Sequence, residues 1–130
     1  MILTGVASRY ACFLKENIME SFKKVPQGLL ELIENKLKLS NGGYLRYEWD
    51  NYIGGNAWIV STLWLAMYYI ETQNYDRATE LFDWVTEHAD NLNFLPEQIE
   101  RNGHKSAWVM QLSWSHAMYV IVKNKLMNKQ

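Results

Sequence analysis

The stretch of this 130-residue chain that most restricts its fold is residues 51–70, twenty residues without a formal charge. Its first part is rich in Asn and Gly, so the strongly apolar piece begins only at Ala57. A piece of that length is short for a membrane span and is typical of a helix buried in a protein core. We therefore predict a central helix over residues 57–72 that is buried on most sides.

Four other segments have apolar residues at helical spacing with polar residues between them. A short Gln73-Asn74 link after the central helix indicates an antiparallel helical hairpin, and Asn56 can cap the central helix. No segment has a strong strand pattern. The sequence thus predicts one domain over residues 1–130 with an all-α fold, a helical-hairpin array of about five helices. The four further helices are expected near residues 10–25, 26–37, 74–87 and 113–126.

The inner faces of the last two helices can be named from the spacing of their apolar residues. In the helix over residues 74–87, the inner stripe is Tyr75, Ala78, Leu81, Phe82 and Val85. In the last helix, the residues expected to face inward are Trp114, Ala117, Met118, Ile121, Val122 and Leu126.

Two long connections, residues 43–58 and residues 90–107, have no helical period. Structureless connections of this length are uncommon in compact domains and often carry function. The first connection is dense in Gly, aromatic residues and charges of both signs. We therefore expect both connections to be functional loops.

Composition excludes several classes of function. The net charge is −1, which gives no electrostatic footprint for nucleic acid or a membrane surface. A single cysteine and no signal peptide pattern lead us to expect a reducing, cytoplasmic location. The three histidines lack close ligand spacing and no cysteine pair supports them, so we expect no metal and no cofactor.

Glu97 is the candidate catalytic residue. It follows Pro96, which has no backbone N–H and disfavours helix in the residue before it. Apolar residues on both sides favour burial, so the carboxylate is held on a stiff segment at the edge of a core. The simpler alternative is a loop Glu near a helix start, stabilised by the helix dipole.

Arg46 is the notable residue of the first loop. Its planar guanidinium can hold hydroxyl groups or a carboxylate through two hydrogen bonds. The alternative is a surface arginine paired with Glu48 or Asp50.

Three stretches together resemble glycoside hydrolase family 15, the glucoamylase family. They are GGYLRYEWDNYIGGNAW (residues 42–58), LPEQ (residues 95–98) and LSWSHA (residues 112–117). Their order and spacing resemble the end of that family's catalytic domain, and the resemblance covers residues 27–126. It implies part of an (α/α)6 barrel, with concentric rings of inner and outer helices, and hydrolysis of α-glucosidic bonds with inversion.

The resemblance also implies roles for individual residues. Glu97 matches the general base, and Arg46 and Trp114 match residues that contact the sugar in the first subsite. Tyr47 and Asp50 match positions that line the same cleft. Inversion uses an acid and a base that are roughly 6.5–9.5 Å apart, so that a water molecule fits between the base and the sugar.

The sequence also departs from the family pattern. Nothing in residues 1–41 resembles the segment that carries the general acid, and Glu48 and Ala57 stand where the family usually has proline. A partial barrel exposes apolar helices, so we expect a homo-oligomer or a partner that supplies the missing helices. The expected ligand is an α-glucoside or maltooligosaccharide.

Three hypotheses of function are compatible with the sequence. The chain is a glycosidase portion that is active only with another source of the acid, or a non-catalytic α-helical module that binds sugar or protein. A trehalase or glucodextranase specificity within the same family is the third.

Overall fold

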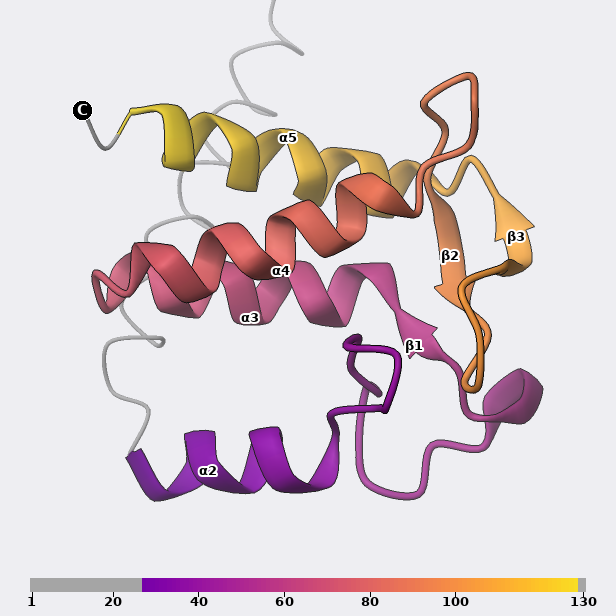
Figure 1. Ribbon diagram of the computed structural model, residues 1–130, viewed down its shortest axis with the longest axis horizontal. Helices are drawn as coiled ribbons and strands as arrows, with labels where there is room; N and C mark the ends of the chain where they lie inside the picture. Colours follow the sequence, from indigo (N-terminus) through magenta and orange to yellow (C-terminus); the bar gives the residue numbers. More distant parts are fainter. Residues whose placement is uncertain (1–26, 129–130) are drawn as a thin grey trace, which may run out of the picture.

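The computed structural model describes residues 27–128 of the chain, and within them it is mostly helical with a small antiparallel sheet at one end (Figure 1). The helix expected near residues 10–25 lies outside the described residues. The described elements are, in order, α2 (Gln27–Lys36), a 3-10 helix (Tyr52–Gly54), β1 (Ala57–Trp58), α3 (Ile59–Glu71), α4 (Tyr75–Glu87), β2 (Pro96–Ile99), β3 (Ser106–Met110) and α5 (Ser113–Met127).

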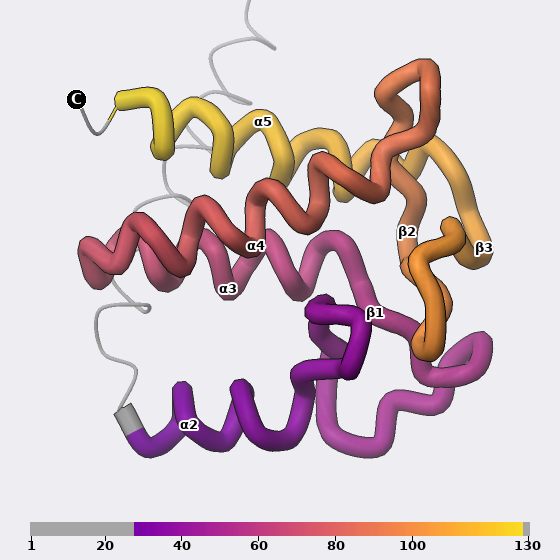
Figure 2. The backbone as a smooth tube through the Cα atoms, in the orientation of Figure 1, coloured from indigo at the N-terminus to yellow at the C-terminus, as the bar shows by residue number. Residues whose placement is uncertain are grey.

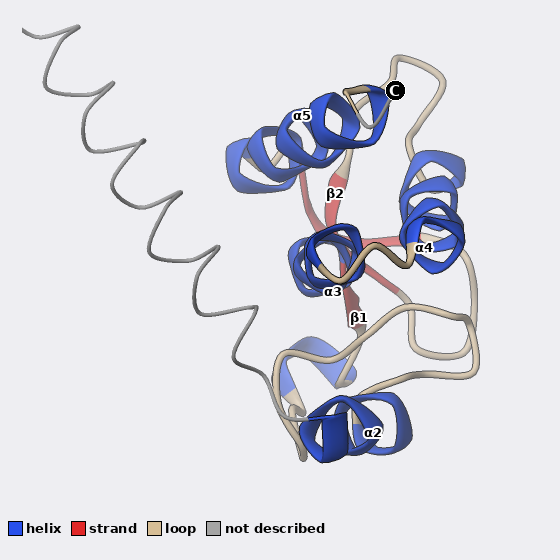
Figure 3. Ribbon diagram, turned by 90° about the vertical axis from the view of Figure 1, so that its left-hand side faces the viewer, coloured by secondary structure: helices blue, strands red, loops and turns tan. Residues whose placement is uncertain are grey.

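The central helix is α3, as the sequence predicts. Viewed end-on in Figure 3, it lies among the other helices, and it contacts both α4 and α5. Every residue of α3 is buried except Trp64 and Glu71. The helix starts two residues later than predicted because Ala57 and Trp58 pair with β2 instead.

The hairpin of α3 and α4 is confirmed. The side chain of Asn74 accepts a hydrogen bond from the backbone N–H of Arg77 and so caps α4. Of the predicted stripe, Ala78, Leu81 and Val85 are buried. In the part of the chain that the structure describes, no helix combines the length and hydropathy needed to cross a bilayer.

The small sheet corrects the all-α prediction. Its strand order is β1-β2-β3, and both neighbouring pairs are antiparallel. The prediction failed because the strands are short and lack an alternating pattern, so that their pairing depends on tertiary contacts rather than on local sequence. Glu97 therefore lies on a strand, β2, and not in a loop. Asn56, expected to cap α3, instead donates through Nδ2 to the side chain of Gln98 on β2.

The expected inner face of α5 is correct only in part. Val122 is buried, and Met118 and Leu126 pack against the core. Trp114, Ala117 and Ile121 are exposed instead. Apolar residues occur on more than one face of this helix, and α3 and α4 cover only one of those faces, so spacing alone does not decide which face is buried.

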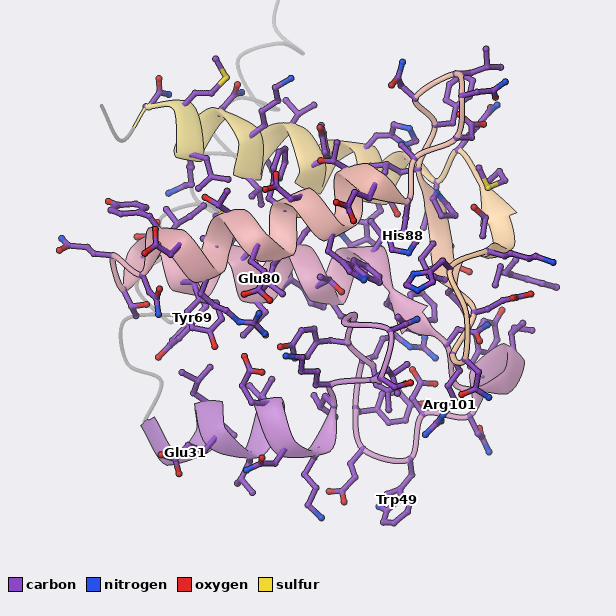
Figure 4. All side chains as sticks on the ribbon, in the orientation of Figure 1. Glu31, Trp49, Tyr69, Glu80, His88 and Arg101 are labelled. Atoms are coloured by element: carbon purple, nitrogen blue, oxygen red, sulfur yellow. The ribbon has the colours of Figure 1, made fainter. Side chains whose placement is uncertain are left out.

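A polar cluster ties α2 to the central hairpin. The carboxylate of Glu34 on α2 accepts hydrogen bonds from the hydroxyl groups of Tyr44 (2.7 Å) and Tyr69 (2.6 Å), and Arg77 donates to the Tyr44 hydroxyl (2.7 Å). Figure 4 labels Tyr69 in the space between α2 and the α3–α4 hairpin. Burial and the Glu34 carboxylate raise the pKa of Tyr69 to about 12. Burial alone would raise the pKa of Glu34, but the hydrogen bonds from Tyr69 and Tyr44, together with the charges of Arg77 and Lys38, lower it.

Candidate active site

The connection between α2 and β1 runs along the same end of the molecule as the sheet (Figure 2). Within it, Tyr44 pairs with both Lys38 and Trp58 through isolated β-bridges. The chain then turns tightly, with φ of +70° at Trp49 and +71° at Gly55. A Cβ atom on Gly55 would lie 2.7 Å from the carbonyl oxygen of Asp50, so glycine is required there.

Within this connection, Arg46 forms a two-point ion pair with Asp50. Its Nε and Nη2 atoms donate to the two carboxylate oxygens at 2.8 and 3.0 Å, and the backbone N–H of Tyr52 donates to the same carboxylate at 3.1 Å. The Arg46 hydrogen bonds are the main reason why the pKa of Asp50 is lowered, against the opposing effect of burial. The alternative in which Arg46 pairs with Asp50 is therefore correct, and the carboxylate fixes the direction of the guanidinium.

Aromatic rings surround the Arg46 guanidinium. Its central carbon lies 3.9 Å from the ring centroid of Trp58, 5.1 Å from that of Tyr52 and 5.4 Å from that of Tyr47. These are cation–π distances. The Arg46 cation is therefore in contact distance of three aromatic rings, which can stabilise its charge.

Glu97 lies on β2 close enough to this cation for the two charges to interact. The hydrogen bond with Asp50 is the main cause that raises the pKa of Arg46, and the charge of Glu97 acts in the same direction. The Glu97 carboxylate accepts a hydrogen bond from Gln98 Nε2 at 3.0 Å. Gln98 is fully buried, and its amide oxygen accepts from Asn56 Nδ2 at 3.2 Å. The buried side-chain amides of Asn56 and Gln98 therefore orient the Glu97 carboxylate.

The start of α5 holds the backbone of this strand. The hydroxyl of Ser115, which is fully buried, donates to the carbonyl of Pro96 at 3.0 Å. The backbone N–H of Leu95 donates to His116 Nε2 at 3.1 Å, and His116 Nδ1 faces the carbonyl of Leu112 at 2.9 Å. These two contacts assign the proton of a neutral His116 to Nδ1. The second and third motif stretches are thus joined by direct hydrogen bonds.

Trp114 is 53% exposed at the start of α5 and meets Trp64 of α3 edge-to-face, with ring centroids 5.5 Å apart. Trp64 and Arg46 both line a groove of about 190 Å³ between α2 and α3. Most of the other lining side chains are apolar, among them Leu29, Leu30, Ile33, Leu37 and Leu65.

The structure thus brings four of the five predicted site residues close together. Arg46 contacts Asp50 and the Tyr47 ring, and its charge interacts with that of Glu97. Within residues 27–128, Trp114 is connected to this group through Trp64 and the groove.

Sequence reasoning missed the residues that support the site. Trp58, Tyr52, Asn56 and Gln98 lie within the quoted motifs, but no spacing rule indicates that a tryptophan ring stacks on Arg46. Ser115 lies in the third motif stretch, and its contact with Pro96 crosses 19 positions of sequence. Among the described residues, Trp58 Nε1 and Ser61 Oγ are buried without a hydrogen-bond partner.

Comparison with curated proteins gives two informative relatives. The chain is 35% identical to an uncharacterized glycosyl hydrolase of Methanocaldococcus jannaschii, over 70% of this chain and 17% of that protein. It is 29% identical to an isomaltose glucohydrolase of Kribbella flavida, over 66% of this chain and 25% of that protein. The chain resembles glycoside hydrolases. It spans about a fifth of the length of these relatives, and no family model matches it.

Solved structures of glycosidases have a part with a similar fold. A wild-type glycosidase superposes with a TM-score of 0.66 at 24% identity, over 73% of this chain and 28% of the glycosidase chain. A variant glycosidase in complex with glucose superposes equally well, with 23% identity. The described fold therefore occurs as one part of larger glycosidases.

Proposed function

We propose that the chain forms the C-terminal portion of the catalytic domain of a glucoamylase-like, inverting glycoside hydrolase of family 15. In this proposal, α2 to α5 are part of an (α/α)6 barrel, over residues 27–126. The relatives named glycosyl hydrolase and isomaltose glucohydrolase, and the superposition on glycosidases, support the class. The finer assignment rests on the three motif stretches and on their contacts.

One observation carries the proposal, namely that the Glu97 carboxylate is fixed from two directions and that its charge interacts with that of Arg46. Gln98 holds its carboxylate, and α5 holds the preceding backbone through Ser115 and His116. A carboxylate fixed in this way suits a general base that removes a proton from water as that water attacks the anomeric carbon. A separate acid must protonate the leaving oxygen, and no residue in the described part is assigned to that role.

The other site residues position the sugar in this proposal. Arg46 donates to sugar hydroxyls. Asp50 does not contact the sugar, because this residue is only 2% exposed; its carboxylate instead fixes the direction of the Arg46 guanidinium. The exposed rings of Tyr47 and Trp114 provide apolar walls. The buried indole N–H of Trp58 still needs an acceptor, which a ligand or a further part of the protein would provide.

Glucose release tests the proposal. We expect the protein, with its acid segment present, to release β-glucose from maltooligosaccharides or isomaltose, with the anomer read by proton NMR. Glu97→Gln should abolish release because an amide cannot accept the proton, while the free energy of unfolding stays nearly unchanged. Glu100→Gln makes the same change at an exposed turn and should leave release intact. Full activity in Glu97→Gln would remove the assigned base.

A non-catalytic module that binds sugar or protein is the second candidate, because the described part lacks an assigned acid. Calorimetric titration with maltose separates the two candidates: binding heat without any release, in a protein that includes the acid segment, favours the module. A trehalase or glucodextranase specificity would appear as preferential release from trehalose or dextran-type oligosaccharides.

We also propose that the exposed apolar surface is covered by other barrel helices, from a second copy or a partner. Leu29, Leu32, Trp64, Trp114 and Ile121 are each between 38% and 55% exposed. Leu29 and Trp64 line the same groove, and Trp64 contacts Trp114, so part of this surface is contiguous. Soluble proteins seldom leave large contiguous apolar areas free.

We therefore expect light scattering on the isolated chain to give a mass above one chain that rises with concentration. Trp114→Asp should shift this equilibrium towards the monomer because it places a charge in the apolar surface. A monomer at all concentrations would contradict self-association.

A further inference from the structure

The strand pairing opposite Glu97 is irregular. Between two paired positions, β2 has one residue, Glu97, whereas β3 has two, Trp108 and Val109. This is a β-bulge, a feature that is frequent next to active sites because it redirects a side chain. The bulge lies on the edge strand of the sheet, β3, next to the candidate base.

The backbone of Trp108 is strained at this bulge. Its φ is +66°, in the left-handed region, where glycine is the usual residue at a bulge and a bulky side chain is unfavourable. Packing in the core does not explain the tryptophan, since its side chain is 58% exposed. A strained, exposed tryptophan beside a catalytic candidate indicates a functional constraint on this position.

The ring of Trp108 continues the aromatic group around Arg46. It meets Tyr52 edge-to-face, with centroids 6.4 Å apart, and Tyr52 in turn lies 6.0 Å from Trp58. Arg46 is placed over both Tyr52 and Trp58. Trp108 is therefore one ring further from the guanidinium than Tyr52, at the outer end of a continuous aromatic surface.

We propose that Trp108 forms the wall for a second sugar unit, the one joined to the glucosyl unit at Arg46. Its flat exposed ring offers the stacking surface that a pyranose face takes. This inference rests on the proposed function and adds the residue that makes the site prefer a disaccharide over glucose. In this proposal, the aromatic ring at the bulge provides the stacking surface, which explains why a tryptophan occupies this strained position and not a glycine.

The test compares glucose with isomaltose and maltose by NMR titration of the full chain. In Trp108→Gly, we expect disaccharide affinity to fall about tenfold, the size of one aromatic contact, while glucose affinity stays unchanged. The melting temperature should stay within a few degrees of wild type, because glycine relieves the backbone strain. Trp108→Phe should retain most of the disaccharide affinity.

Gln111→Gly is the matched control. Gln111 is exposed and has φ of +62° close to the same strand, so glycine relieves similar strain without removing a ring. We expect its disaccharide affinity to equal that of wild type. If Trp108→Gly leaves disaccharide affinity unchanged, or lowers glucose and disaccharide affinity equally, Trp108 does not bind the second sugar unit. The proposed function would not be affected by that result. If the wild-type protein binds neither glucose nor a disaccharide, the proposed function is wrong, and so is the role of Trp108 that rests on it.

Discussion

Leu81→Ala is expected to lower the free energy of unfolding by about 2–5 kcal/mol. Leu81 is 1% exposed on the inner face of α4, where it belongs to the core cluster around α3. Removing its side chain leaves a cavity, because the surrounding helices can close only part of the space. Urea unfolding followed by circular dichroism measures the change, provided that the slope of the transition stays constant.

The control for this prediction is the same substitution at an exposed leucine. Leu92 is 67% exposed, so Leu92→Ala should change the free energy of unfolding by less than about 0.5 kcal/mol. Equal losses in the two variants would mean that α4 does not bury the face that carries Leu81.

The central hairpin could be predicted from sequence because its signals are local. An uncharged apolar run predicts α3, and Asn74 with a regular stripe predicts the start and the buried face of α4. These signals act within one or two turns, so they do not depend on the rest of the fold.

The sheet could not be predicted because its cause is tertiary. The pairing of Ala57 with Ile99 joins positions far apart in the chain, and neither strand has an alternating pattern. The exposed face of α5 was missed for a related reason: spacing shows which residues are apolar but not which neighbouring helix is present to cover them.

The sequence indicated which residues to consider for the candidate site but not how they are arranged. Arg46, Tyr47, Asp50 and Glu97 came from motifs, and all four lie at one end of the molecule. The hydrogen bonds that connect the motifs, such as the one from Ser115 to Pro96, join segments whose contact no local rule indicates.

Breaking the ion pair of Arg46 and Asp50 is expected to lower the free energy of unfolding substantially. Asp50 has a fully buried side chain, whereas the side chain of Arg46 is 31% exposed. Arg46→Ala leaves a buried carboxylate without its cation, which costs about 3–5 kcal/mol for a fully buried pair. Because the guanidinium is partly exposed, we expect a loss near the lower end, about 3 kcal/mol at pH 7. Lys36→Ala is the control, since Lys36 pairs with Glu48 at the surface and its loss should cost under about 1 kcal/mol.

The stability lost in Arg46→Ala should be smaller at acidic pH than at pH 7. In the wild type, the folded-state pKa of Asp50 lies below its ordinary value of 3.8, so the carboxylate stabilises the fold above that pH. That contribution is lost as the pH falls through the lowered folded-state value. In Arg46→Ala, burial without the guanidinium raises the pKa of Asp50, so the variant regains stability on acidification as the carboxyl group takes up a proton. Urea unfolding at pH 7 and near pH 3 should therefore show the gap between the two proteins closing, and a gap that stays constant would show that the charge of Asp50 is not the cause of the loss.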